Sequence, residues 1–285
     1  MTLEQTKRRR QAIATIHDIV GAMRAIAAGR IQGAQRALAS SHRYEDVVLR
    51  AILTLTEGYD RIPLRAAHGQ PTLLIVMTSE QPLCGTFNQD VLSLAERRLH
   101  ELRAKGEVRL MVVGHRGARQ LATHGIVSDA AESAATSVHG LRDVVNHLGA
   151  FVDQRVAAGQ LGTLRAVYSR YKSISEQVPT DEQILPIDLT KIREFALPVK
   201  KNYDRQLPDP VLLAGLISQY AFIRLCRIAA DSFASEQASR LTAMDAATRN
   251  TEKMLNSILD LERRERQGEI TRQVLELVAS RFASS

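Results

Sequence analysis

The residues that could perform acid–base, nucleophilic or metal chemistry are scattered along this 285-residue chain. None of the eight histidines stands four residues from another, and no Cys-x-x-Cys occurs. A metal site would need ligands at such short spacings, so we expect no metal. Cys84 precedes an expected helix, but no base can be assigned to it, and a packed thiol is the favoured interpretation. Cys84 and Cys226 lie far apart, which favours a reducing compartment over a disulfide.

Phosphate-binding loops are also missing from the sequence. There is no Gly-x-x-x-x-Gly-Lys-Ser/Thr and no Gly-x-Gly-x-x-Gly after an apolar strand. Gly114-His-Arg-Gly117 follows such a strand, and its N–H groups could bind an anion. A tight strand-to-helix turn explains the same glycines without a ligand. We therefore expect no cofactor.

The charge distribution indicates a partner with negative potential. The formal net charge is +7, and Lys7-Arg-Arg-Arg10 is its densest cluster. Cations in the first turns of a helix oppose its dipole, so this cluster is either a solvated helix end or a site for an acidic partner. Nucleic acid, anionic lipid and an acidic protein surface all fit. Basic residues interleaved with aromatics, which nucleic-acid binding would favour, are not found.

The C-terminal quarter, Val211 to Ser285, predicts one long helix. It has no proline and only two glycines, so nothing forces the helix to end. Such a helix would be about 110 Å long and must pack along most of its length. The small side chains of Ala234 to Arg240 would let another backbone come close. Apolar residues recur at three- and four-residue steps: Leu213, Leu216, Tyr220, Ile223, Leu241, Met244, Leu255 and Ile258.

Residues Thr2 to Thr56 predict a second long helix, with no proline before Pro63. Two narrow apolar stripes at the two ends of the chain bury most economically against one another, as an antiparallel coiled coil. Gly21, Gly29 and Gly33 each weaken a helix by about 1 kcal/mol relative to Ala, which favours close approach of another segment as their purpose. The stripe consists of Ile13, Ile16, Val20, Met23, Ala27, Ile31, Ala34 and Leu38.

The middle of the chain alternates strand and helix patterns. This alternation predicts a Rossmann-like α/β domain with a largely parallel sheet. Asn88 is the expected N-cap of its first helix. Strands are expected at Thr72–Thr78, Arg109–Val113, Leu164–Ser169 and Gln183–Ile187, and helices at Asn88–Lys105, Arg116–Thr123 and Leu141–Ala158.

The predicted fold class is therefore α/β, a long antiparallel coiled coil of N- and C-terminal helices with an inserted Rossmann-like domain. The expected divisions are an N-terminal helix at 1–58, the α/β domain at 70–190 and a C-terminal helix at 208–285. Pro198, Pro208 and Pro210 mark the linker into the last helix. No apolar run approaches the roughly 20 residues of a membrane span.

The segment Ala234-Ser-Glu-Gln-Ala-Ser-Arg240-Leu-Thr-Ala-Met244-Asp-Ala-Ala-Thr248-Arg-Asn250 closely resembles the signature of the gamma subunit of F-type ATP synthases. The resemblance covers nearly the whole chain in the order of the family. Further matches are Ala22-Met23, Ala34-Gln35, Leu83-Cys-Gly85, Phe87-Asn88, Arg266-Gln267, Ile270-Thr271 and Glu276.

The resemblance implies a non-catalytic rotor shaft whose terminal helices run up the centre of a ring of alpha and beta subunits. The α/β domain would bear on the epsilon subunit and on the c-ring of the membrane sector. The resemblance also implies a peripheral position on the cytoplasmic side of a bacterial plasma membrane, with H⁺ or Na⁺ as coupling ion. Expected ring contacts are Met23, Arg24, Arg240, Arg266, Gln267 and Thr271, although Met23 also lies on the apolar stripe.

The sequence departs from the family pattern at three places, one of them around Gly29-Arg30, where the Lys that usually follows the Met23 region is replaced. The usual Asp-Arg-Gly before Leu-Cys-Gly is Glu80-Gln81-Pro82 here, and the usual Lys-Ile-Thr before Ala-Met is Asp18-Ile-Val20. These changes indicate a divergent branch, such as an alternative bacterial F-type ATPase. Two other classes remain open: a Rossmann-like enzyme with a coiled-coil arm, which would need a phosphate-binding turn, and a basic nucleic-acid binder, whose affinity would fall steeply with salt.

Overall fold

The computed structural model describes residues 3–56, 70–188 and 208–283. By compactness the chain divides into two units. The larger unit is Ala27–Arg240, and the smaller unit joins Met1–Ile26 to Leu241–Ser285. The predicted boundaries near 58 and 190, and Pro198, lie outside the described residues.

The larger unit contains a five-stranded sheet with the order β3-β2-β1-β4-β5. β1, β2, β3 and β4 run parallel, and β5 pairs antiparallel with β4. The strands expected at Thr72–Thr78, Arg109–Val113 and Leu164–Ser169 are confirmed. β5 overlaps the expected Gln183–Ile187 only in part, because it begins at Gln177 and ends at Leu185, and β3, only three residues long, was not foreseen. The bounds are β1 Thr72–Met77, α2 Phe87–Arg103, β2 Val108–Val113, α3 His115–Thr123, β3 Ala130–Glu132, α4 Gly140–Ala157, β4 Thr163–Tyr171 and β5 Gln177–Leu185.

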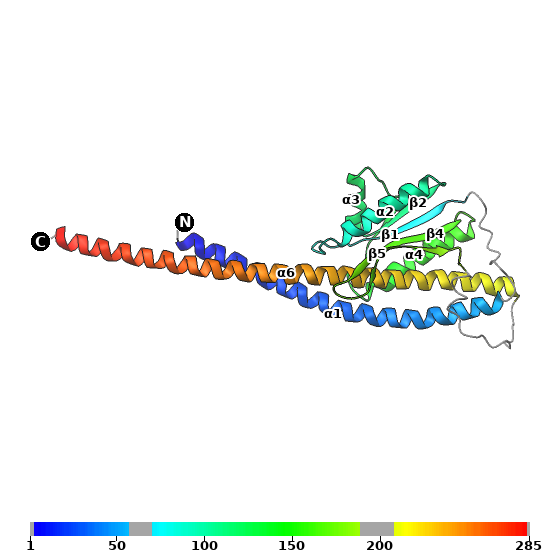
Figure 1. Cartoon of the computed structure of the whole chain (residues 1–285), viewed down its shortest axis with the longest axis horizontal. Helices are drawn as coiled ribbons and strands as arrows, with labels where there is room; N and C mark the ends of the chain where they lie inside the picture. Colours follow the sequence, from blue (N-terminus) through cyan, green and yellow to red (C-terminus); the bar gives the residue numbers. More distant parts are fainter. Residues whose placement is uncertain (1–2, 57–69, 189–207, 284–285) are drawn as a thin grey trace. The chain divides into compact units, whose positions relative to one another are not determined.

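Alternating side chains of the central strands enter two separate apolar cores, because successive residues of a strand point to opposite faces. Leu74 and Val76 pack on the α2 and α3 side. Leu73 and Ile75 pack on the other side, with α4 and the two long helices. Figure 1 shows α2 and α3 together over one face of the sheet. Both faces are thus covered, which explains the continuous apolar runs of β1 and β2.

The two long helices are α1, Leu3–Leu55, and α6, Asp209–Ala283. Both agree with the lengths predicted from their apolar periodicity. Within the larger unit they supply fully buried side chains to the core, including Ile52 and Leu225. Pro210, expected in the linker, instead lies in the first turn of α6, where a missing N–H costs no helical hydrogen bond.

In the smaller unit, α1 and α6 are joined by polar contacts between their side chains. Arg10 Nε lies 3.2 Å from Glu262 Oε2, and Arg24 Nη1 lies 3.1 Å from Asp245 Oδ1. Thr6 Oγ1 donates to Glu265 Oε2 at 2.6 Å. Residue numbers on α6 fall as those on α1 rise, so the two helices are antiparallel in this unit.

The three glycines of α1 have different surroundings. A Cβ at Gly33 would lie 2.7 Å from Val138 Cγ2, so a side chain there would clash with the loop before α4. Nothing lies within 4 Å of a Cβ at Gly21 or Gly29. Close approach is therefore confirmed for Gly33, and it is wrong for the other two as far as the described residues show.

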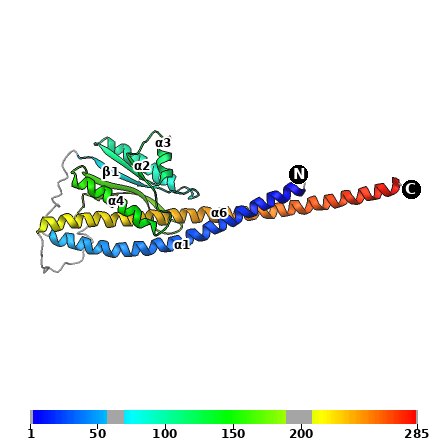
Figure 2. The ribbon, with the colours of Figure 1, turned by 180° about the vertical axis from the view of Figure 1, so that it is seen from behind.

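Each long helix contains an 18-residue window apolar enough, by length and composition alone, to cross a membrane. The expectation that no stretch approaches a span is therefore wrong by this measure. In α6 the window is 39% buried, because this helix also builds the apolar core. Core helices pass the same test, so the windows are weak indications of a span. Figure 2 shows from behind how α4 and α6 lie beside the sheet in the larger unit.

Candidate functional site

The carboxyl ends of β1 and β4 mark the place where an open parallel sheet usually binds a ligand. The chain proceeds from β1 to β2 and β3 on one side and returns to β4 on the other. At such a switch point the loops diverge and leave a crevice, which holds the ligand in nucleotide-binding folds of this type. What occupies this crevice here decides between the enzyme and the non-catalytic hypotheses.

Side chains of α6 occupy this crevice. Ser235 Oγ donates to the Ser169 carbonyl at 2.9 Å, and the Tyr171 N–H donates to the Asp231 carboxylate at 3.3 Å, both at the end of β4. On the β1 side, Arg240 Nη2 donates to the carbonyls of Gln81 and Pro82 at 3.4 and 3.3 Å. The small residues of the signature thus let α6 approach the strand ends, as their size predicted.

A small cavity of about 20 Å³ lies beside Glu236, close to the carboxyl ends of β1 and β2, and Thr78, Ala134 and Phe233 also line it. This volume holds about one water molecule, which needs roughly 10–15 Å³.

Glu236 and Arg240 form a buried ion pair one turn apart on α6. Glu236 Oε1 lies 2.7 Å from Arg240 Nη1, and the two side chains are 7% and 3% exposed. Burial raises the pKa of Glu236, and the neighbouring Arg240 opposes this shift only in part. Arg240 therefore compensates a buried carboxylate while it binds the loop after β1.

Hydrogen bonds of two polar side chains, Asn88 and Glu80, also hold the loop after β1. Asn88 accepts the Ser79 N–H at 2.9 Å and donates to Ser79 Oγ at 2.8 Å. The prediction that Asn88 is an N-cap is therefore wrong: Thr86 precedes the helix, and the Asn88 side chain turns back to Ser79. Glu80 Oε2 accepts the N–H groups of His115 and Ala134 at 3.2 and 3.1 Å.

The Gly114-His-Arg-Gly117 turn therefore has an anion from its own chain, the Glu80 carboxylate at the start of α3. Gly114 has a φ of +102°, which favours glycine. A Cβ at Gly117 would lie 2.2 Å from Thr78 Oγ1. Both glycines are explained by this turn and its packing on Thr78, as the tight-turn interpretation predicted.

Both cysteines are free thiols. Cys84 is buried, and its Sγ lies 3.4 Å from Ser79 Oγ. Burial raises the pKa of Cys226 to about 11, so this thiol stays protonated at neutral pH. Among the described residues, no group of three or more His, Cys, Asp or Glu side chains is placed to hold a metal ion.

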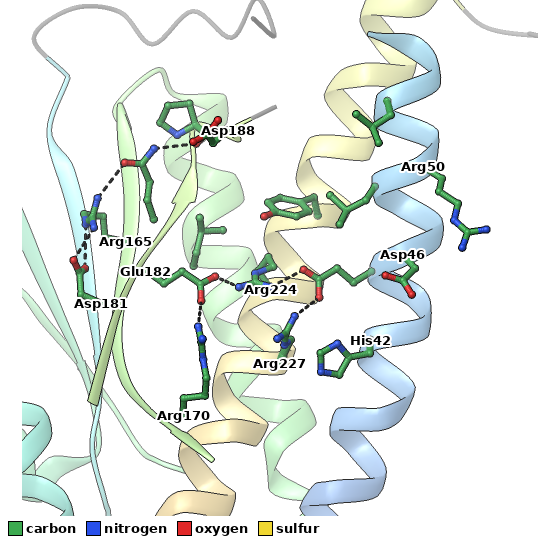
Figure 3. Close-up of a pocket in the computed structure, with 17 residues that line it drawn as sticks. His42, Asp46, Arg50, Arg165, Arg170, Asp181, Glu182, Asp188, Arg224 and Arg227 are labelled. Carbon is green, nitrogen blue, oxygen red and sulfur yellow. Dashed lines mark hydrogen bonds and ion pairs between the residues drawn. The ribbon is translucent and has the colours of Figure 1, made fainter. Parts of the chain in front are cut away.

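A second, larger cavity lies between β5 and the two long helices (Figure 3). Its volume is about 990 Å³, and charged side chains of both signs line it. Glu45 of α1 points toward Arg224 and Arg227 of α6. Only the two arginines have a local signal in the sequence, because residues three positions apart share a helix face. Their acidic partner is 179 residues away from Arg224.

The residues expected to contact other subunits fall into two groups. Met23 is half-buried and Arg24 is exposed, and Arg266, Gln267 and Thr271 are exposed on α6, all in the smaller unit. The Thr271 hydroxyl donates to the Gln267 carbonyl at 2.9 Å, which places the two one turn apart. Arg240 belongs to the larger unit, and its guanidinium is enclosed by its own chain.

Comparison with known proteins gives consistent results along the whole chain. A family model described as ATP synthase matches residues 2–283. The ATP synthase gamma chain of Fuscovulum blasticum is 30% identical over 291 residues, with 98% of each chain covered. That of Paracoccus denitrificans (strain Pd 1222) is 29% identical, again over 98% of each chain.

Solved structures agree in fold. A chain of the Euglena gracilis mitochondrial ATP synthase, in its OSCP/F1/c-ring structure, has a TM-score of 0.64 at 15% identity, covering 99% of this chain and 94% of that one. A chain of the rotor of the same enzyme has a TM-score of 0.60 at 14% identity, covering 94% and 98%. From the full-length sequence match and this fold, the chain belongs to the ATP synthase gamma chain family.

Proposed function

We propose that this chain is the central-stalk rotor subunit of an F-type ATP synthase, in which it couples ion-driven rotation to the conformations of the catalytic subunits. The observation that carries the proposal is the match to ATP synthase gamma chains over 98% of this chain and 98% of the relative. A structural neighbour is described as a rotor, in agreement with this role.

In this proposal α1 and α6 form the shaft, as an antiparallel coiled coil. Their polar contacts in the smaller unit, from Thr6 to Arg24 on α1, support the pairing. The recurrence of apolar residues every three or four positions on both helices supports a continuous seam. The division into helix 1–58, α/β domain 70–190 and helix 208–285 belongs to the same proposal.

Catalysis would take place in the beta subunits, with this chain supplying no catalytic residue. The crevice of the α/β domain supports this assignment, because α6 side chains already bind the strand ends there. A rotating shaft acts by presenting a different face to each beta subunit. Only differential contacts shift a conformational equilibrium, so an asymmetric shaft can favour a different state in each one.

The proposed partners are the alpha and beta subunits, the epsilon subunit and the c-ring, with the complex peripheral on the cytoplasmic side of a bacterial plasma membrane. Membership of a complex described with F1 and a c-ring is what the structural neighbour supports. We propose Met23, Arg24, Arg266, Gln267 and Thr271 as ring contacts, since four of the five are exposed. Arg240 stays in this set on the signature alone, because its own chain buries it.

The proposal is tested by purifying the chain at native expression levels, identifying what comes with it, and measuring ATP hydrolysis. Alpha and beta subunits with ATPase activity are the expected result, and the isolated chain should show no turnover. Recovery of nucleic acid, with a gel-shift affinity that falls steeply with salt, would instead support the basic coiled-coil alternative.

A further inference from the structure

A group of charged side chains connects four elements of the larger unit. We call it the Glu45 cluster: Glu45 of α1, Arg224 and Arg227 of α6, Arg170 of β4 and Glu182 of β5. Figure 3 shows Arg170 of β4 and Arg224 of α6 both pointing toward Glu182 of β5. The cluster lines the larger cavity, and no catalytic or ligand-binding step accounts for it.

Each carboxylate in the cluster is held by more than one donor. Glu45 Oε1 accepts from Arg224 Nη1 at 2.5 Å, and Oε2 accepts from Arg227 Nη1 at 2.8 Å. Glu182 Oε1 pairs with Arg224 Nη2, and Oε2 accepts from the Tyr168 hydroxyl at 2.9 Å and from Arg170 at 3.2 Å. Arg224 therefore bridges the α1 carboxylate and the β5 carboxylate.

The centre of the cluster is largely withdrawn from solvent, whereas the Arg227 and Arg170 side chains are 22% and 41% exposed. The side chains of Glu45 and Arg224 are 7% and 11% exposed, and that of Glu182 is 16% exposed. Charge-assisted hydrogen bonds in such surroundings are stronger and more directional than those at the surface. Removing one partner leaves the others buried and uncompensated, which is strongly unfavourable. The relative positions of α1, α6 and β5 are therefore specified by charge at this point.

Apolar packing alone would hold the same elements less specifically. The hydrophobic effect is non-directional and scales with buried area, so small sliding movements that keep the area cost little. An Arg224 fork with one carboxylate on each side permits no such movement without losing a charged hydrogen bond. A shaft under torque needs this kind of resistance where its helices join the domain that receives the load.

We propose that the Glu45 cluster is a torque-bearing lock that fixes α1, α6 and the sheet against slip while the rotor works under load. The inference rests on the proposed rotor function. Its residues are positioning residues: they contact no substrate, and they keep the two shaft helices in register with the α/β domain.

The test uses membrane vesicles that contain the assembled enzyme, with ATP hydrolysis measured before and after a protonophore and a sodium ionophore are added together. In a coupled enzyme the ion gradient restrains hydrolysis, and the ionophores relieve this load. The variant is Glu45→Gln, which keeps the shape and removes the charge. The matched control is Glu107→Gln, which removes one charge from an exposed pair with Arg109 in the same unit.

For Glu45→Gln we expect unloaded hydrolysis per assembled complex within about twofold of the native rate, and stimulation by ionophores reduced by at least about half. Glu107→Gln should retain both native values. A merely structural role would lower the amount of complex and leave the stimulation ratio native, and this result would overturn the lock. Native stimulation in Glu45→Gln at full assembly would overturn it as well.

Glu182→Gln keeps the Glu45 pairs and removes the carboxylate charge of β5 that Arg224 and Arg170 share, so it provides the same test if Glu45→Gln does not assemble. Failure of both variants to assemble would assign the cluster to assembly and reject the lock. Measurements on the native enzyme distinguish a failure of the proposed rotor function from a failure of the lock alone. If the native chain brings no coupled ATPase, the rotor function fails; if it does and the variants remain coupled, only the lock fails.

Discussion

Replacing Arg240 by Met should destabilise the larger unit by about 3–4 kcal/mol at pH 7. The substitution keeps most of the apolar stem and removes the charge that compensates Glu236, which is 5% exposed. It also removes two donors to the loop after β1, at 3.3 and 3.4 Å, which are long and therefore weak bonds. Most of the expected loss therefore comes from the uncompensated carboxylate.

Protonation limits this loss. An isolated Glu236 can avoid its penalty by taking up a proton, and from the ordinary pKa of 4.5 this costs at most about 3.4 kcal/mol at pH 7. Lost hydrogen bonds add about 1 kcal/mol, and the already raised pKa of Glu236 makes protonation easier. A carboxyl group whose pKa is higher in the folded than in the unfolded protein contributes its full stability below the pKa of the unfolded state, and this contribution is lost as the pH rises. The effect of Arg240→Met should therefore be larger at pH 7 than at pH 5.

Urea unfolding of the full chain, followed by tyrosine fluorescence, measures this loss, because Tyr168 and Tyr220 are buried in the larger unit. Arg249→Met is the control: it removes an arginine whose side chain is 63% exposed and which also pairs with a carboxylate four residues away. Its cost should stay within about 0.5 kcal/mol. Adding Glu236→Gln to Arg240→Met should recover part of the loss. Equal costs for the two arginine variants, or no recovery, would refute the reasoning.

Three further predictions concern other parts of the chain. Burial acts to raise the pKa of Glu45, but Arg224 and Arg227 lower it, so the stability that Glu45 contributes is present above pH 4.5 and lost below it. The stability deficit of Glu45→Gln, measured by urea unfolding, should therefore shrink from pH 6 to pH 3. A constant deficit would be evidence against the pairing. Gly29→Ala should stabilise the isolated chain by about 1 kcal/mol through helix propensity and so raise its thermal midpoint. Gly33→Ala should be less stable than Gly29→Ala by about 1–3 kcal/mol, because its added methyl group would clash with Val138. Equal midpoints for the two variants would contradict this difference. Deleting the exposed end of α6 from Ile270 onward should leave the urea transition of the larger unit unchanged and weaken recovery with alpha and beta subunits; loss of the tyrosine transition would show that the larger unit depends on this end.

The long helices and four strands could be predicted because their signals are local. Apolar periodicity and the positions of proline determine α1, α6, β1 and β2 from neighbouring residues alone. β3 could not be found in this way, since three residues, Ala-Ala-Glu, have little strand propensity of their own and pair only because β2 lies beside them. Asn88 was assigned wrongly for a related reason: its side chain forms hydrogen bonds with the buried Ser79 and does not cap the helix.

The site was predictable only to the extent that it depends on side-chain size. The small residues of the signature correctly indicated close approach of a backbone, and Ser235 meets the Ser169 carbonyl. The Glu45 cluster depends on charges brought together from α1, β4, β5 and α6. Glu45 is 179 and 182 positions away from its partners Arg224 and Arg227, so no short window of sequence contains both sides of these pairs.

A ligand site and a rigid attachment compete for the same groups at the end of an open parallel sheet. The free backbone N–H and C=O groups there can bind either a substrate or another part of the protein, because a buried polar group must have a partner. In this chain the Tyr171 N–H and the carbonyls of Ser169, Gln81 and Pro82 are bound by α6 side chains. The strand ends of this α/β domain therefore use, for binding α6, backbone groups of the kind that bind a ligand in other open parallel sheets.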